Sequence, residues 1–244
     1  MSTVDHEILG GVAVSHGRGY AATPAHDRRP IAVRPDRAEE LANTLTHGAG
    51  LVLSIAGLYA LVLIAGESQS PGVALGCGIY GGSLVLLYAA STLYHGWQDA
   101  GVKRVLLLLD HIGIYVLIAG TYTPLALIPL RGAVGQVLLV LVWGFALVGS
   151  AVKVRRLDRL DDDSSMPYVV MGCMIMAVIE RLHATSPPAG FLWFLAGGAF
   201  YAIGLYFFVR DARRFDHAIW HLFVLAGSVC HYRAVIVFAI SAPA

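Results

Sequence analysis

Charged residues are scarce in this sequence. Asp, Glu, Lys and Arg make up 14% of its 244 residues, and 57% of the residues are hydrophobic. A soluble domain carries about a quarter charged residues. The formal net charge is only +1, and no basic block is present to neutralise the phosphates of a nucleic acid. These shortages argue against a soluble domain and against a nucleic-acid partner, and they indicate a membrane protein.

Cysteine is rare as well. Cys77, Cys173 and Cys230 each lie within an apolar run, at spacings that fit neither a disulfide framework nor a thiolate zinc site. We therefore expect all three to be small, buried, apolar residues.

The first 36 residues lack a sustained apolar run. They contain Gly, Pro, Arg and Asp, and they show no signal-peptide pattern of basic start, apolar core and small-residue cleavage site. We expect residues 1–36 to form a flexible cytoplasmic tail and residues 37–244 to form the transmembrane domain.

Long apolar runs follow this tail. A helix needs about 20 mostly apolar residues to cross the hydrocarbon core of a membrane. Seven runs qualify, at residues 43–65, 72–95, 105–127, 134–152, 167–185, 190–209 and 217–240. The fifth is the weakest, because Glu180, Arg181 and His183 crowd its end. Since the connections are short, the sequence predicts an all-α integral membrane protein, a bundle of seven transmembrane helices.

Lys and Arg are distributed unevenly among the connections. If the amino terminus is cytoplasmic, fourteen of the 17 lie on the inner side, only Arg131 and Arg181 lie outside, and Arg233 falls within the seventh run. Because cytoplasmic loops retain positive residues, we expect the amino terminus inside and the carboxyl terminus outside.

This topology brings ionisable residues from several runs to one depth. Intramembrane ionisable residues are costly and are candidates for function. Six of them belong to the cytoplasmic leaflet, at the ends of four runs: His47, His95, Asp110, His111, His217 and His221. Core histidines scattered without a function would not share one layer in this way.

Two pairs in this layer have helical spacing. His217 and His221 are four residues apart, as are Ser91 and His95, so each pair shares one helix face. Three neutral imidazoles and a water form a tetrahedral zinc site with an open position. We therefore expect His95, His217 and His221 to bind one metal ion, with a carboxylate nearby to orient a ligand.

Other interpretations apply to the remaining histidines. For His111 and His231 we favour hydrogen-bonded core residues. The fourteen-residue spacing of His217 and His231 is also compatible with two haem ligands. No matching histidine is evident for the deeper of the two, so haem ranks below zinc.

Five motifs run through the core of the chain in a fixed order. They are ELANTLTH at 40–47, STLYH at 91–95, LDHIGIY at 109–115, AGTYTP at 119–124 and HAIWHLFVLAGSVCH at 217–231. In these motifs the chain resembles the hemolysin III branch of the progestin and adipoQ receptor (PAQR) family, which is related to the alkaline ceramidase superfamily.

The resemblance implies seven helices, an inside amino terminus, the inner (plasma) membrane of a bacterium and a zinc ion in the inner leaflet. The implied zinc ligands are His95, His217 and His221. Asp110 matches the acidic residue that contacts the zinc-bound water, and Ser91 matches the hydroxyl nearby. Glu40, Asn43 and His47 match a family motif for which the resemblance implies no definite role.

Zinc would activate water near neutral pH, with Asp110 as base and Ser91 as donor to a developing oxyanion. We therefore expect a zinc-dependent hydrolase acting on a membrane lipid, through a ceramide-like amide or an ester. One alternative is a non-enzymatic, zinc-stabilised receptor or lipid-homeostasis protein. Another is a membrane-lytic hemolysin, although polar residues confined to one layer do not line a pore.

Overall fold

The computed structural model of the protein describes residues 36–157, 160, 164–210 and 213–242. The helices in chain order are α1 Arg37–Glu67, α2 Pro71–Gly96, α3 Ala100–Leu127, α4 Ala133–Arg155, α5 Met166–Cys173, the 3-10 helix η2 Met174–Val178, α6 Ile179–Thr185, α7 Pro188–Arg210 and α8 Asp216–Ile240. The prediction of a flexible tail falls on residues outside this range, except for Asp36.

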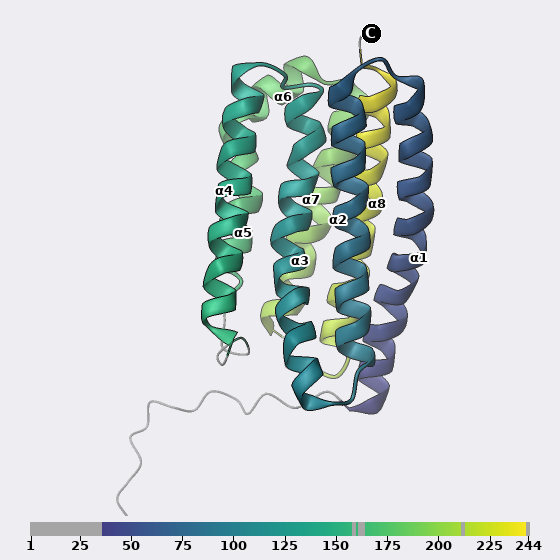
Figure 1. Cartoon of the computed structure of the whole chain (residues 1–244), viewed down its shortest axis with the longest axis vertical. Helices are drawn as coiled ribbons and strands as arrows, with labels where there is room; N and C mark the ends of the chain where they lie inside the picture. Colours follow the sequence, from purple (N-terminus) through teal and green to yellow (C-terminus); the bar gives the residue numbers. More distant parts are fainter. Residues whose placement is uncertain (1–35, 158–159, 161–163, 211–212, 243–244) are drawn as a thin grey trace, which may run out of the picture. The chain divides into compact units, whose positions relative to one another are not determined.

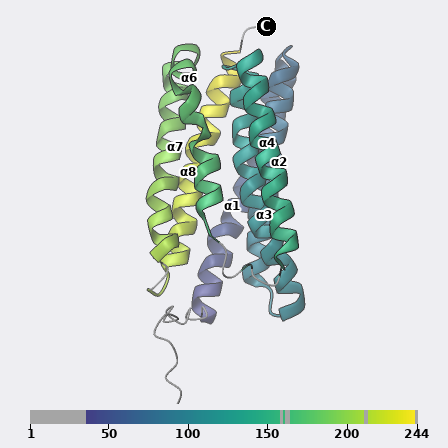
Figure 2. The same cartoon turned by 90° about the vertical axis from the view of Figure 1, so that its left-hand side faces the viewer.

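The described residues contain seven spans that are long and apolar enough to cross a membrane, with α5, η2 and α6 together forming the fifth. Each predicted run lies within one of these spans, and no strand occurs in the described ranges. Figure 1 and Figure 2 show the spans lying side by side. The prediction of an all-α, seven-helix integral membrane protein is confirmed.

The first helix begins six residues before its predicted apolar run, at Arg37. Asp36 Oδ1 accepts hydrogen bonds from the Ala38 and Glu39 N–H groups, both at 2.9 Å, and Glu39 Oε2 accepts from Asp36 N–H. The Glu39 N–H bond is the largest influence that holds the pKa of the Asp36 carboxyl below its usual value. This capping box adds nearly two turns to α1, and those turns carry Glu40.

The fifth span is broken in its middle by η2, whereas the weakness expected from the sequence lies at its end, at Glu180, Arg181 and His183. The Tyr122 hydroxyl from α3 accepts from Ile175 N–H at 2.9 Å and donates to the carbonyls of Gly172 at 2.7 Å and Met171 at 3.0 Å. Backbone groups within a bilayer need such partners, because no water is available to them. One phenol therefore stabilises the break.

Glycines allow the close approach of two helix pairs. A Cβ atom on Gly135 of α4 would lie 2.1 Å from the carbonyl oxygen of Ala126, and one on Gly120 of α3 would lie 2.3 Å from Ser83 Oγ of α2. Small residues commonly serve in this way between membrane helices. The α2, α3 and α4 helices therefore form a tightly packed group.

A tyrosine cluster joins α2, α7 and α8. Tyr88 donates to Ser228 Oγ at 2.9 Å, the Tyr201 hydroxyl lies 2.9 Å from the same Oγ, and Tyr80 donates to the Ser228 carbonyl at 3.1 Å. Ser228 is 4% exposed. The cluster thus holds α8 in the interior, where its first turns reach the site described below.

One prediction about the cysteines is wrong. Cys77 and Cys230 are buried, but Cys173 is exposed. A transmembrane helix is apolar on its lipid-facing side as well as toward the core. An apolar run therefore does not reveal which of its residues face inward, and Cys173 lies on the outer side of α5.

Candidate metal centre

Three histidines from two helices meet at one end of the bundle. His95 lies in the last turn of α2, while His217 and His221 lie one turn apart at the beginning of α8. Their candidate ligand atoms all lie within 4.8 Å of one another, and the ring centroids are 4.6 to 5.2 Å apart. The structure thus brings together the three residues that the sequence selected.

The beginning of α8 is held in place by a compact set of polar contacts. Asp216 accepts from Arg210 Nη2 at 3.1 Å and from Arg213 N–H at 3.0 Å. The preceding Phe215 has φ of 68°, and its N–H donates to Glu39 Oε1 at 2.9 Å. Positive φ is unfavourable for a bulky residue, so these contacts maintain a turn that aims His217 and His221 at α2.

His95 provides the test of whether a metal fits. Its ring is 4% exposed, its Nδ1 donates to Glu40 Oε2 at 2.7 Å, and its buried Nε2 has no hydrogen-bond partner. A buried polar nitrogen without a partner is costly. A metal ion between this nitrogen and those of His217 and His221 would satisfy it.

The spacing of the three rings also suits a tetrahedral ion. Ligand nitrogens about 2.0–2.1 Å from zinc are about 3.4 Å from one another. The observed limit of 4.8 Å needs only small side-chain rotations to reach this distance. Imidazole donors suit zinc, copper, iron and nickel ions. The donor set is therefore compatible with zinc but does not distinguish it from these other metals.

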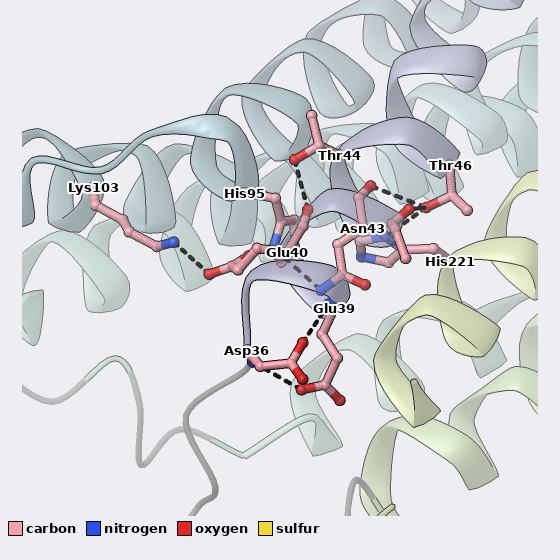
Figure 3. Close-up of polar contacts among 10 residues, drawn as sticks. Asp36, Glu39, Glu40, Asn43, Thr44, Thr46, His95, Lys103 and His221 are labelled. Atoms are coloured by element: carbon pink, nitrogen blue, oxygen red, sulfur yellow. Dashed lines mark hydrogen bonds and ion pairs between the residues drawn. The ribbon is translucent and has the colours of Figure 1, made fainter. Parts of the chain in front are cut away.

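The ELANTLTH motif of α1 lies beside this cluster, as Figure 3 shows for Glu40 and Asn43. Asn43 Nδ2 lies 3.5 Å from His95 Nδ1. The His47 ring stacks on His221, with centroids 3.5 Å apart. All three residues that matched a motif of undefined role therefore contact the histidine cluster.

Asp110 and Ser91 adjoin the same cluster from α3 and α2. The Asp110 carboxyl lies close enough to Ser91 and His95 to interact electrostatically with both, and Ser91 is 1% exposed. Ser91 Oγ is buried without a hydrogen-bond partner. A buried hydroxyl beside a carboxyl and a candidate metal ligand is suited to binding a polar group of a substrate.

The remaining histidines lie outside the three-histidine cluster. His231 lies deeper in α8, where its Nε2 is 3.1 Å from the Phe194 carbonyl oxygen. A Cβ on Gly197 would lie 2.2 Å from this ring, so α7 packs directly on it and leaves no space for a haem. The carbonyl oxygen of His111 accepts from Tyr168 at 3.3 Å.

Two residues that contact the site were not predicted from the sequence. Thr46 Oγ1 lies 3.2 Å from His221 Nδ1, and Lys103 Nζ lies 2.5 Å from Glu40 Oε1. Thr46 occupies a helix face next to that of Glu40 and Asn43. A helical projection of α1 therefore gave a weak indication that Thr46 lies near the site. Lys103 offered none, because its contact with Glu40 joins two side chains 63 residues apart and depends on the tertiary fold.

Sequence comparison agrees with this architecture. The sequence profile of the family described as "Haemolysin-III related" matches residues 36–232. The chain is 40% identical over 202 residues to "Hemolysin-3" of Bacillus cereus, covering 83% of this chain and 92% of that protein. It is 40% identical over 205 residues to "Hemolysin-3 homolog" of Bacillus subtilis (strain 168), covering 84% and 96%.

A more distant similarity extends to mammals. The chain is 27% identical over 208 residues to "Monocyte to macrophage differentiation factor" of Homo sapiens, covering 83% of this chain and 85% of that protein. The residues that match the family profile, 36–232, include the spans that carry the histidine cluster.

Proposed function

We propose that this chain, which belongs to the haemolysin-III related family, is a zinc-dependent hydrolase of an acyl lipid within the membrane. The observation that carries the proposal is the buried, partnerless Nε2 of His95 among three imidazoles, beside a carboxyl and a hydroxyl. An unpartnered buried nitrogen is costly, and in His95 it belongs to a group of three histidines whose ligand atoms lie within 4.8 Å of one another.

His95, His217 and His221 would hold the ion. When bound, zinc supplies Lewis acidity and makes water reactive near neutral pH. Three protein ligands leave a fourth position open, as in catalytic rather than structural zinc sites.

Asp110 and Ser91 supply the acid–base and polar contacts of the reaction. The Asp110 carboxylate accepts a proton from the water whose oxygen bonds to the acyl carbon. It then returns that proton to the amine or alkoxide that leaves as the C–N or C–O bond breaks. The Ser91 hydroxyl donates to the carbonyl oxygen while negative charge accumulates there.

An acyl lipid is the substrate class that matches the surroundings of this site. The site lies inside a bundle whose outer surface is rich in exposed large apolar side chains, including Leu41, Leu45 and Leu93 near the same end. A substrate with long acyl chains remains in the bilayer while its amide or ester reaches the histidines. Ceramide-like amides and glycerolipid esters both meet this requirement.

The uneven distribution of Lys and Arg supports a location of the site in the cytoplasmic leaflet, and the similarity to Bacillus proteins favours a bacterial plasma membrane. Single-cysteine variants of a cysteine-free background test this orientation. Ser241→Cys lies beyond the end of α8 and should react with an impermeant maleimide applied to intact cells. Ser68→Cys, between α1 and α2, lies on the same outer side and should react as well. Protection of both until lysis would reverse the orientation.

The function itself is tested with purified protein in detergent. We expect one zinc per chain by elemental analysis and release of fatty acid from a panel of ceramides and acyl esters. His221→Ala should lose zinc and turnover, whereas His183→Ala, an exposed histidine outside the cluster, should retain both. Asp110→Asn should retain zinc and lose turnover.

Other outcomes point to the other functions. Stoichiometric zinc without turnover on the whole panel would overturn the hydrolase and favour a zinc-stabilised protein. Zinc retained in His221→Ala would overturn the ligand set. Lysis of liposomes that persists in His95→Ala would favour a lytic activity independent of the metal.

A further inference from the structure

The first turns of α1 lie against the histidine cluster without belonging to it. His95 Nδ1 donates to Glu40 Oε2 at 2.7 Å, and His221 Nδ1 lies 3.2 Å from Thr46 Oγ1. Figure 3 shows both side chains reaching from α1 toward the two rings. Each contact engages Nδ1 and leaves the Nε2 of the ring for another partner.

We propose that Glu40 and Thr46 are positioning residues that fix the tautomer and ring orientation of two metal ligands. Glu40 holds His95 and Thr46 holds His221, so that both rings present an unprotonated Nε2 to the ion. This inference rests on the proposed zinc site, and it assigns a role to the motif of α1. Metal-bound histidines generally have their second nitrogen held in this way by a neighbouring group.

The direction of the Thr46 contact follows from its other hydrogen bonds. Its hydroxyl has one proton, which is donated to the carbonyl oxygens of Ala42 at 2.9 Å and Asn43 at 3.0 Å. The oxygen is therefore available to His221 only as an acceptor. This arrangement favours a proton on His221 Nδ1, which leaves Nε2 with a lone pair suited to a metal.

The Glu40 contact has the same consequence for His95. A carboxylate accepts hydrogen bonds and does not donate them, so the proton lies on His95 Nδ1. Lys103 Nζ binds the other carboxylate oxygen, Oε1. This ion pair fixes the rotation of the Glu40 side chain and turns Oε2 toward the ring.

Zinc affinity and the cobalt absorption spectrum test the assignment in pairs of variants. Glu40→Ala should lower zinc affinity by about 10–100-fold, and Thr46→Val should lower it by about tenfold. Thr46→Ser should restore the affinity, because it keeps the acceptor oxygen. Thr44→Val is the matched control, since the Thr44 hydroxyl donates to the Glu40 carbonyl oxygen within α1, at 2.7 Å, rather than to a histidine.

The spectrum separates positioning from folding. In Glu40→Ala and Thr46→Val, the cobalt bands should shift while the helical circular dichroism and the elution volume stay as in the parent protein. Unchanged zinc affinity in both folded variants would overturn this inference and leave the metal site intact. A parent protein that binds no metal would instead overturn the proposed function.

Nitrogen NMR of the parent protein tests the inference without any variant. With histidine labelled in both ring nitrogens, His95 and His221 should each show a protonated Nδ1, before as well as after zinc is added. The signals are assigned by their disappearance in His95→Ala and in His221→Ala. A proton on Nε2 in either ring of the metal-free protein would overturn the proposal, even if Glu40→Ala and Thr46→Val fail to fold.

Discussion

The imidazole rings of His47 and His221 stack face to face, with centroids 3.5 Å apart and planes inclined by 18°. The same His47 ring forms a T-shaped pair with Tyr88, with centroids 5.0 Å apart and an angle of 84°. Both nitrogens of His47 are buried without a hydrogen-bond partner. The contacts of His47 with its neighbours at the site are thus ring contacts, and His47 is not one of the three clustered histidines.

Replacement of His47 by Phe should keep the zinc. The phenyl ring retains the stack on His221 and the edge contact with Tyr88, so zinc affinity should fall by less than about tenfold, the lower end of outer-contact effects. His221→Phe should lose zinc altogether. Elemental analysis and chelator competition measure both, and equal losses in the two variants would make His47 a ligand.

Removal of the Ser228 hydroxyl should weaken the packing of α8. Ser228→Ala leaves the Tyr88 and Tyr201 hydroxyls without their shared partner. The free energy of unfolding in detergent should decrease by about 1–2 kcal/mol. Ser241→Ala, at an exposed position at the end of the same helix, should leave the free energy of unfolding unchanged. Equal effects in the two variants would show that the tyrosine cluster does not stabilise the protein.

Loss of the Tyr122 hydroxyl should destabilise the break in the fifth span. Tyr122→Phe keeps the ring but deprives the Ile175 N–H and the Gly172 carbonyl of their partner. We expect a loss of about 1–3 kcal/mol in unfolding free energy and faster amide exchange at Ile175. Tyr59→Phe, at a position 67% exposed, is the control. Unaltered exchange at Ile175 would contradict the prediction.

A methyl group on Gly135 should separate α3 from α4. Its Cβ would lie 2.1 Å from a backbone oxygen of α3, whereas a Cβ on Gly144 of the same helix would meet nothing within 4 Å. Gly135→Ala should cost about 1–3 kcal/mol of unfolding free energy, as overpacking does. Gly144→Ala should be neutral or slightly stabilising, because alanine favours helix. Similar values for the two would show that α4 can shift outward without cost.

The parts of this protein that were predictable from sequence are those encoded within single helices. The seven spans follow from apolar runs, and the pairing of His217 with His221 follows from the helical repeat. The prediction that His95 joins these two histidines followed from their shared depth in the membrane. The partners of His95 and His221 on α1 did not, because they depend on the rotation of α1 about its own axis. Cys173 was assigned wrongly for a related reason: lipid and core are equally apolar.

The separation of the site's components along the chain has a consequence for biosynthesis. Glu40 and Thr46 belong to the first span, His95 to the second, and His217 and His221 to α8, the last of the seven. The ribosome has therefore completed six spans before two of the three proposed ligands enter the membrane. Metal binding at this site would then require that all seven spans have been inserted. Chains arrested before α8 would expose the polar groups of an incomplete site, which membrane proteases could recognise.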